Sequence, residues 1–385
     1  MAGSCAVIGG GILGSAIAFE LQGSGVETVL VERDMEAQGA SAFSFASLSA
    51  FGEPQRDVYL LKAQGMIGWR QWTKSFGDAL GVRWDGEIRW AENAEAAKQL
   101  DAQIEGALSR GYPVQRMSRT AIIQRLPAVQ PGEVSAASYA SADGQADPVR
   151  TMKVLRSAFL KQGGKLLVGK ATLILTEDKV AVGVGEDRID PERVVVAAGA
   201  ETAALLDRFG WDTPMDPSPG LLVVTSPVQP TLVGAVYVFP EQGPGVHLRQ
   251  LPDGRLLIGE ESQEQVAKEP TMDHAERLLH QAVLSIPALR GADIDHFTVE
   301  WRPMPRDGMP IVGPLPGLGA VYVVTAHSGV TIAPALGRLV AQEIAGREQA
   351  PLLEAFRPGR FGAHQAEADM DIEEIFTAPP ESFLG

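Results

Sequence analysis

The chain has 385 residues, of which 45% are hydrophobic and 21% charged, the balance of a globular protein with ample core material. This length predicts two domains, or one large domain with insertions. The formal net charge of −15 would repel phosphate backbones, so we expect no nucleic-acid partner. The single cysteine, Cys5, excludes an intramolecular disulfide and zinc–cysteine clusters, and we expect no metal. Because no apolar run is long enough for a membrane span and no leader precedes the first strand, we expect a cytoplasmic protein.

The N-terminal segment predicts a strand, a glycine-rich turn, a helix and a second strand. The turn reads Gly9-x-Gly11-x-x-Gly14, which permits a tight turn and lets the backbone approach a pyrophosphate at the helix N-terminus. Glu32 ends the second strand, 32 − 9 = 23 residues beyond Gly9, near the ~20 typical of an acid that binds ribose hydroxyls. The unit predicts dinucleotide binding, with Arg33 as a further candidate. The alternative is a plain tight turn followed by a solvated acid.

The loop over 39–50, GASAFSFASLSA, consists mainly of small residues, several with hydroxyl groups. Such a loop can wrap closely around a flat ring and donate backbone N–H groups to it. The candidates for cofactor contact are Ser41, Ser44 and Ser47. The alternative is a flexible surface loop, but its two phenylalanines argue for partial burial.

The remaining elements alternate between helices and strands. They are predicted as helices over 56–76 and 94–110, a hairpin over 82–93, a helix from about 148, strands through 166–196 and from 221 to 262, a helix over 272–285 and a strand over 295–301. The strand that closes the 166–196 region ends in Ala198 and Gly199, small enough for a nucleotide to lie against, and Ala171 is a further cofactor candidate. The alternative is a core strand with a glycine turn.

Three further sites carry polar groups suited to chemistry. His247 and Arg249 lie two residues apart on a predicted strand, so they share a face. Arg302 lies in WRPMPRDGMPIVG, a stiff segment that could hold a guanidinium for bidentate contact with a carboxylate; the alternative is a surface arginine. His327 precedes the last helix and could be purely structural.

The last helix begins at Gly329, Val330 and Thr331, where free N–H groups and the positive end of the helix dipole favour an anion. The order of all these elements predicts an α/β fold with an α+β second domain. We expect a Rossmann-type nucleotide-binding domain assembled from separated segments and a second domain rich in β-sheet. The expected ranges are 1–81, 142–220 and 296–358 for the first, 82–141 and 221–295 for the second, and 359–385 for a C-terminal tail.

Five segments resemble, in this order, the D-amino acid oxidase superfamily of flavoproteins, which includes glycine oxidase and sarcosine oxidase. They are VIGGGILGSAIAFEL, DGQADP, VVVAAGAET, WRPMPRDGMPIVG and HSGVTIAPALG. The resemblance implies an FAD cofactor, with the substrate bound beneath the sheet of the second domain. It also implies that the 39–50 loop passes the flavin ring and that residues 329–331 cradle its pyrimidine edge. Because the loop has no Cys or His to tether a flavin, non-covalent FAD is implied.

The resemblance assigns Arg302 to the carboxylate of an amino acid substrate, with His327, His247 and Arg249 as further candidates. It implies that hydride leaves the Cα of an uncharged amine for flavin N5, and that the imine hydrolyses to a 2-oxo acid and an amine. We favour an N-substituted glycine or another secondary amino acid, which would give glyoxylate or another 2-oxo acid, with O2 reduced to H2O2. A D-amino acid or glycine itself is an open alternative, and the oligomeric state is not predicted.

Two other functions stay open at this point. Sarcosine oxidases carry a lysine near the flavin where this chain has Leu257, which keeps open a dehydrogenase with a protein or quinone acceptor. The second open function is a non-catalytic FAD-binding subunit that docks through the acidic segment 365–374.

Overall fold

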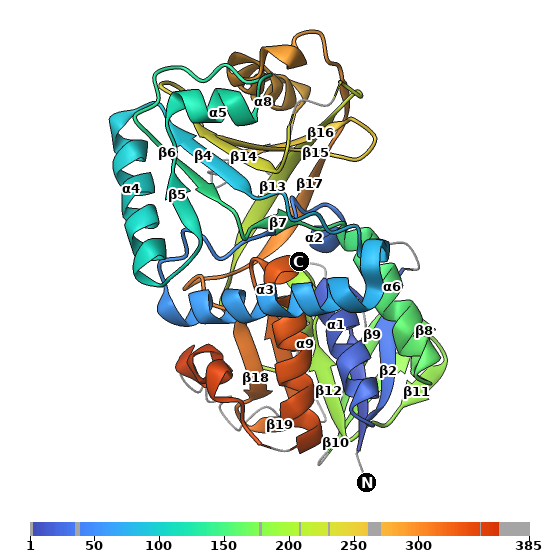
Figure 1. The fold of residues 1–385 in the computed structure, drawn as a ribbon. Helices are drawn as coiled ribbons and strands as arrows, with labels where there is room; N and C mark the ends of the chain where they lie inside the picture. Colours follow the sequence, from blue (N-terminus) through green and yellow to red (C-terminus); the bar gives the residue numbers. More distant parts are fainter. Residues whose placement is uncertain are drawn as a thin grey trace.

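The computed structural model describes residues 3–34, 39–176, 179–207, 209–229, 232–260, 271–346 and 348–361. Figure 1 shows two layered parts, one built on each of two sheets, with the chain passing repeatedly between them. The predicted mixture of α/β and α+β architecture is confirmed.

Within the described ranges, one sheet has six strands in the order β18-β19-β12-β1-β2-β8. Its strands are β18 (Ile311–Leu315), β19 (Leu318–Thr325), β12 (Arg193–Val196), β1 (Ser4–Ile8), β2 (Glu27–Glu32) and β8 (Lys165–Val168). All neighbours are parallel except β18, which pairs with β19 in the antiparallel sense. The central strands are buried apolar runs, as expected for parallel strands covered on both faces.

Helices cover one face of this sheet. They are α1 (Ile12–Gly23), α3 (Arg56–Phe76), α6 (Pro148–Lys161) and α9 (Gly329–Gly346), and α1 packs against both α6 and α9. The other face is covered by a three-stranded sheet of β9 (Ala171–Thr176), β10 (Lys179–Val184) and β11 (Asp187–Ile189), whose valines join the core of the six-stranded sheet. The glycine turn between β1 and α1 therefore lies at the carboxyl edge of a fully covered sheet, where α/β folds bind ligands.

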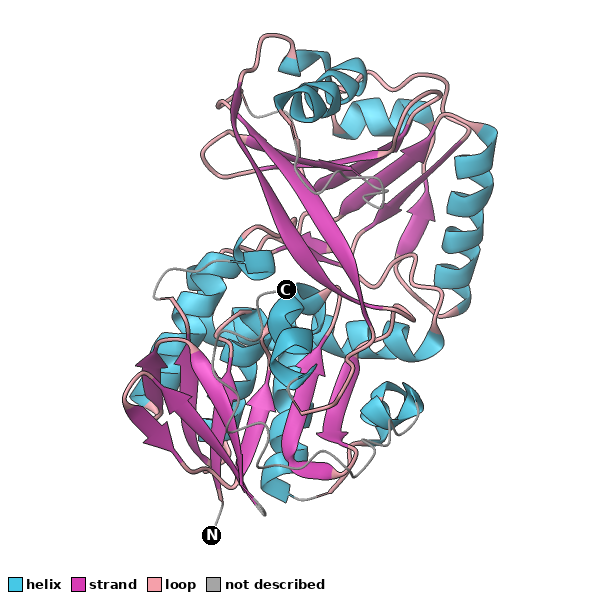
Figure 2. Ribbon diagram, turned by 180° about the vertical axis from the view of Figure 1, so that it is seen from behind, coloured by secondary structure: helices cyan, strands magenta, loops and turns pink. Residues whose placement is uncertain are grey.

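The second sheet has the order β17-β13-β16-β15-β14-β4-β6-β5 among the described strands. The strands are β17 (Ile294–Pro305), β13 (Met215–Thr225), β16 (Leu256–Glu260), β15 (Val246–Gln250), β14 (Ala235–Phe239), β4 (Glu87–Ala91), β6 (Ala136–Ala140) and β5 (Val114–Arg116). Helices α5 (Arg119–Arg125) and α8 (Met272–Ser285) pack on its outer face, and α4 (Ala94–Ser109) lies along β4, β5 and β6. Figure 2 shows the long β13–β17 pair descending from this sheet toward the six-stranded one.

Short elements complete the described chain. They are α2 (Gly39–Ala42), β3 (Ser47–Leu48), β7 (Gly144–Gln145), α7 (Thr202–Asp207) and the 3₁₀ turns Gly77–Leu80, Gly199–Glu201, Pro287–Leu289, Pro351–Phe356 and Pro358–Phe361. β3 pairs with β7 in the antiparallel sense and so fixes the 39–50 loop between the two sheets. None of the described helices combines the length and the apolar character needed to cross a membrane.

Three expectations differ from the structure. The hairpin predicted over 82–93 is absent, because β4 pairs with β14 and β6 instead. The boundaries expected at 220/221 and 295/296 fall inside β13 and β17, both of which belong to the eight-stranded sheet. The strand expected to end at residue 301 continues to Pro305 and so contains Arg302. The tail beyond residue 361, with its acidic segment, lies outside the described residues.

Candidate active site

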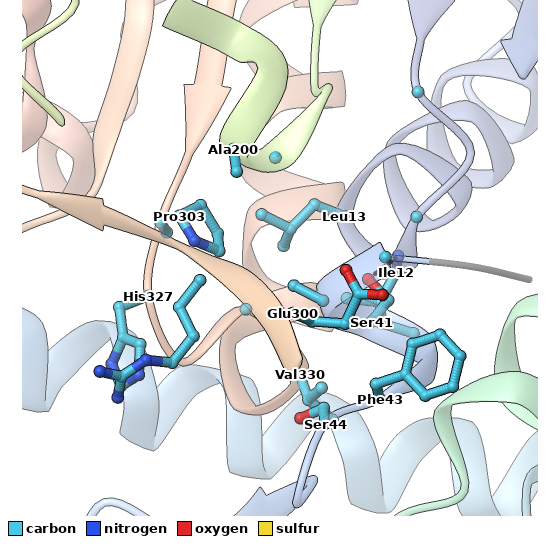
Figure 3. Close-up of a pocket in the computed structure, with 18 of the residues that line it drawn as sticks. Ile12, Leu13, Ser41, Phe43, Ser44, Ala200, Glu300, Pro303, His327 and Val330 are labelled. Carbon is cyan, nitrogen blue, oxygen red and sulfur yellow. Dashed lines mark hydrogen bonds between the residues drawn. The ribbon is translucent and has the colours of Figure 1, made fainter. Parts of the chain in front are cut away.

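A cavity of about 860 Å³ lies between the two sheets. It is lined by the glycine turn, the end of β2, the 39–50 loop, the turn after β12, the start of α9 and the inner face of the eight-stranded sheet. Figure 3 shows residues from the start of α1, the loop, β17 and the start of α9 gathered around one space. Segments far apart in the sequence thus form a single binding site.

The glycine turn has three positions with different requirements. Gly9 has φ +97°, and a Cβ there would lie 2.5 Å from the Ala197 carbonyl oxygen. A Cβ on Gly14 would lie 1.8 Å from the Gly9 carbonyl oxygen, so this glycine is needed for strand and helix to meet. Gly11 has only Ser41 Oγ nearby, at 3.1 Å, and lines the cavity. The first and third glycines serve the fold, while the second leaves room for a ligand.

Glu32 and Arg33 both line the cavity at the end of β2. Glu32 accepts a 2.5 Å hydrogen bond from the Gly10 N–H, and Arg33 forms an exposed ion pair with Glu201 at 2.6 Å. Arg156 of α6, which the sequence did not suggest, donates to the Gly10 carbonyl and lies 3.9 Å from Glu32. Burial lowers the pKa of this arginine. The acid and the arginine together brace the glycine turn.

The three candidate serines of the 39–50 loop all line the cavity. Ser41 Oγ accepts a hydrogen bond from the Ile12 N–H at 3.0 Å, and Ser44 Oγ accepts one from the Ala46 N–H at 3.0 Å. Ser47 Oγ donates to Glu87 at 3.2 Å. The Ser41 bond holds the loop against the start of α1, whereas the Ser47 bond and the β3–β7 pair hold its other end against β4 and β7.

The remaining residues predicted to contact the cofactor also line the cavity. Ala198 and Gly199 follow β12, and Ala171 begins β9; all three line the cavity. Gly329, Val330 and Thr331 line it from the first turn of α9. Thr331 Oγ1 donates to the Ser47 carbonyl at 2.9 Å, and Trp69 Nε1 donates to the Val330 carbonyl at 2.8 Å. The N-terminus of α9 is therefore fixed, with its positive dipole end directed at the cavity.

Arg302 lines the cavity from the edge strand β17. Its Nη2 donates a 2.5 Å hydrogen bond to Oγ of Ser218, the residue opposite it on β13. Prolines occupy alternate positions of the same ladder, where Pro217 faces Pro303 and Pro219 faces Trp301. Antiparallel ladders need N–H groups only at alternate pairs, so these prolines are compatible with the pairing that holds Arg302.

His327 lies between β19 and α9, and its side chain is exposed to the cavity that it lines. Withdrawal from bulk water and, to a smaller extent, the positive charges of Arg302 and Lys62 lower its pKa to about 4. The ring is therefore neutral at neutral pH, and its Nδ1 lies 3.2 Å from Ser328 Oγ.

His247 and Arg249 share a face of β15, as predicted, but they have different neighbours across the sheet. His247 pairs with Tyr237 and packs edge-on against Phe45, and it lines the cavity. Arg249 is 7% exposed, donates to the Ala146 carbonyl at 2.9 Å and is not among the described lining residues. Burial lowers its pKa to about 10. The structure thus places the histidine in the cavity wall and the arginine behind it.

Two further cations line the sheet side of the cavity without having been predicted, Lys62 of α3 and Arg89 of β4. The sequence contains a signal for Arg89, because Glu87 and Arg89 carry opposite charges two residues apart in an otherwise apolar strand. Nothing in the sequence distinguishes Lys62 from the other charged residues of its helix.

The residues present fit FAD. The turn at Gly11 leaves space beside a helix N-terminus, Glu32 lines the cavity at the end of β2 where the ribose of FAD would be held, and the cavity extends from there past the 39–50 loop to the sheet. A second helix N-terminus, that of α9, meets the cavity further along, where a flavin ring would gain negative charge on reduction.

Comparison with known proteins identifies relatives that cover most of the chain. One subunit of the opine oxidase of Rhizobium meliloti is 27% identical, covering 94% of this chain and 98% of the relative. Glycine oxidase of Pseudomonas aeruginosa is 28% identical over 89% of this chain and 94% of the relative. The crystal structure of glycine oxidase from Geobacillus kaustophilus superposes with a TM-score of 0.83 at 23% identity, covering 92% of this chain and 98% of that one. The profile of the family described as "DAO: FAD dependent oxidoreductase" matches residues 4–343. The chain belongs to this family of FAD-dependent oxidoreductases.

Proposed function

We propose that this protein oxidises the C–N bond of a small amino acid, in particular an N-substituted glycine or another secondary amino acid. The observation that carries the proposal is Arg302, a guanidinium that faces the FAD cavity beside His327 and is backed by Ser218. A guanidinium held in this way suits bidentate contact with a carboxylate. The carboxylate of the substrate would thereby fix the position of its Cα and its amine.

The surrounding residues support the same chemistry. Neutral His327 can exchange a hydrogen bond with the substrate without adding positive charge next to the amine. Phe45, Tyr237 and His247 pack against one another and form an aromatic part of the cavity wall beneath the sheet. FAD, when bound, supplies the acceptor for the hydride that leaves Cα. The resulting imine would hydrolyse to glyoxylate or another 2-oxo acid and an amine, and O2 would be reduced to H2O2.

The fixed N-terminus of α9 supports the electron-accepting half of the reaction. Its N–H groups at residues 329–331 and its dipole favour negative charge in the adjacent part of the cavity. Orientation and this electrostatic support would carry much of the catalysis, which requires no nucleophilic triad.

A dehydrogenase that passes electrons to a protein or quinone is the second candidate. Leu257 favours this candidate. It is buried on β16 at the position where sarcosine oxidases have a lysine near the flavin. Glycine oxidase or D-amino acid oxidase activity would use the same Arg302 anchor. A non-catalytic FAD-binding subunit is the remaining alternative, and one relative is named as a subunit of opine oxidase.

The decisive experiment is anaerobic titration of the FAD-loaded protein with a panel of amines, followed by flavin absorbance. We expect bleaching by N-substituted glycines and weaker or no bleaching by the matching amines without a carboxylate. Admission of air should restore the yellow colour and produce H2O2. If no amine bleaches the flavin, the protein is not an amine-oxidising enzyme; if bleaching occurs and air produces no peroxide, the dehydrogenase replaces the oxidase as the proposed function.

A further inference from the structure

Three cationic side chains from three different elements line the part of the cavity beneath the eight-stranded sheet. They are Arg302 of β17, Lys62 of α3 and Arg89 of β4. The proposed reaction uses only Arg302, as the anchor for one carboxylate. The other two cations therefore need a separate explanation.

Each of these two cations is held from behind by a carboxylate. Lys62 Nζ lies 2.7 Å from Glu53, and Arg89 Nε donates to Glu87 at 2.6 Å. Among the described residues that line the cavity, both cations are present and neither glutamate is. Glu87 is only 1% exposed and also accepts a hydrogen bond from Ser47. In both pairs the cation faces the cavity, and the acid lies on its far side and orients it.

The two cations belong to one stretch of the cavity wall. The Arg89 guanidinium lies 4.7 Å from the centre of the Phe51 ring, and a Cβ on Gly52 would come within 3.1 Å of its Nη1. The next residue, Glu53, is the partner of Lys62. The segment 51–53 thus connects the two side chains. Tyr237, across the ladder from Arg89, also lies 4.7 Å from that guanidinium.

The positive charges extend their effect across the cavity to the predicted reaction site. Arg302 and Lys62 both lower the pKa of His327, which lies between β19 and α9. Glu260 and Glu300 also line the cavity, so the preference for an anionic ligand is confined to the stretch of wall where Lys62 and Arg89 face the cavity and their glutamate partners do not. A substrate with a single carboxylate on Arg302 would bring no negative charge to the Lys62 and Arg89 end of the cavity.

We propose that Lys62 and Arg89 form a second anion subsite, so that the substrate is a secondary amine whose N-substituent ends in a second carboxylate. This inference rests on the proposed function, because Arg302 must hold the first carboxylate. The reaction is otherwise the same: hydride leaves Cα for FAD, water adds to the imine, and the C–N bond breaks. The products are then a 2-oxo acid and an amine that retains the second carboxylate.

Binding of unreactive ethers tests the subsite without turnover. Methoxyacetate and oxydiacetate are matched ether analogues with one and two carboxylates, and two longer diacids, 3-(carboxymethoxy)propanoate and 4-(carboxymethoxy)butanoate, extend the second arm. Affinity for the FAD-loaded protein is measured by the change in flavin absorbance and by calorimetry. We expect at least one diacid to bind about 10-fold or more tightly than methoxyacetate, as a charge-assisted contact to a fixed cation would give.

Variants assign this preference to the two cations. We expect Lys62→Met to reduce the diacid-to-monoacid affinity ratio about 10-fold while leaving methoxyacetate binding unchanged. Arg89→Met alone would leave Glu87 buried without its partner, so the double variant Glu87→Gln/Arg89→Met is used and should have the same effect. Lys74→Met, an exposed position on the same helix, is the matched control and should keep the parent ratio.

The outcomes separate this inference from the proposed function. If every diacid binds no more tightly than methoxyacetate, or if both variants keep the parent ratio, the second subsite is wrong. Bleaching of the flavin by amines with one carboxylate would in that case leave the proposed function intact. If no amine of either kind bleaches the flavin while the diacid preference depends on Lys62 and Arg89, the anion subsite stands and the proposed reaction is wrong.

Discussion

Ser218 lies directly opposite Arg302 in the β13–β17 ladder, and its Oγ accepts a 2.5 Å hydrogen bond from the arginine. The two residues lie 84 positions apart in the sequence, yet strand pairing puts both side chains on the same face of the sheet, and Arg302 lines the cavity there. The hydroxyl fixes one nitrogen of the guanidinium, and the prolines on both strands stiffen the backbone that carries it. Arg302 is thus pre-oriented before any substrate binds.

Replacement of Arg302 by lysine should weaken substrate use and leave FAD binding intact. Lysine keeps the charge and loses the planar fork that matches a carboxylate. The loss of one charge-assisted hydrogen bond should cost roughly 1.5–3 kcal/mol, which corresponds to about 10- to 150-fold in kcat/KM. The measurement is steady-state kinetics of parent and variant with an N-substituted glycine, together with flavin content.

The control for this variant is an amine that lacks the carboxylate. Such an amine never uses the anchor, so the variant and the parent should oxidise it at the same rate. An equal loss on both substrates would show that Arg302 supports the fold or the flavin. No loss on either would show that it is not the anchor, and attention would pass to His247, the other predicted substrate contact in the cavity wall.

The order of elements was largely predictable from local patterns, because each depends on short-range signals. The helices over 56–76 and 272–285 have the predicted bounds, and the βαβ unit at the N-terminus is present. The hairpin at 82–93 was wrong because its Asp-Gly turn is a local signal and the partners of β4 are not local. Both edges of β4 are paired, with β14 and with β6, and both of these strands lie more than 40 residues downstream.

The cavity wall shows the same limit at the level of single residues. Residues of a known motif, such as Gly11 and Glu32, could be assigned because the motif carries its own geometry. The sequence predicts that Arg249 and His247 lie on the same face of a strand. It does not predict which residues of β14 and β16 lie beside each of them, because that depends on strand register. Lys62 reaches the cavity only because α3 packs beneath it, and no pattern in one helix reports such tertiary packing.

Gly11→Val should abolish cofactor retention while the protein still folds. Gly11 has φ −60°, which any residue adopts, and the only atom close to a new Cβ is Ser41 Oγ. The added side chain would instead fill the space for the pyrophosphate. We expect a native circular dichroism spectrum with little or no flavin. Gly14→Val is the contrasting variant, and it should fail to fold because its Cβ would collide with the Gly9 carbonyl. Full flavin occupancy in Gly11→Val would show that the cofactor lies elsewhere.

The flavin should be held without a covalent bond. The only cysteine, Cys5, is buried in β1, and burial raises the pKa of its thiol to about 12, so it offers no thiolate. The 39–50 loop contains neither Cys nor His. Acid or heat precipitation should therefore leave FAD in the supernatant, identified by chromatography. Yellow colour that remains with the precipitated protein would reveal a covalent attachment.

His327 should make the protein less stable as the pH falls. Its folded pKa of about 4 lies below the ordinary value of 6.5, so between these values the unfolded chain binds more protons than the folded one. The contribution of this group to stability is therefore lost progressively as the pH falls from about 6.5 to 4. We expect the Tm to drop less between pH 7 and pH 5 in His327→Gln than in the parent. Equal drops would show that the folded protein does not disfavour protonation of this ring.

The contribution of Asp143 to stability should depend on pH in the opposite direction. Its side chain accepts hydrogen bonds from Tyr112 and, at 2.7 Å, from Ser49, and it is fully buried beside Glu87 and Arg89. Burial and the negative charge of Glu87 raise its pKa to about 8, against the favourable effects of its hydrogen bonds and of the arginine.

Because the folded pKa of Asp143 lies above its ordinary value of 3.8, the folded protein binds the extra proton between these two values. The unfolded chain binds fewer protons there, so the contribution of Asp143 to stability decreases as the pH rises from about 4 to about 8 and is constant above that range. Asp143→Asn keeps the size of the side chain and cannot ionise. We expect the variant to gain Tm relative to the parent as the pH is raised from 5 to 8, measured by thermal unfolding of the FAD-loaded proteins at fixed ionic strength. A difference in Tm between parent and variant that does not change with pH would show that the carboxyl group ionises normally in the folded protein, with Arg89 and the hydrogen bonds from Tyr112 and Ser49 compensating its burial and the charge of Glu87.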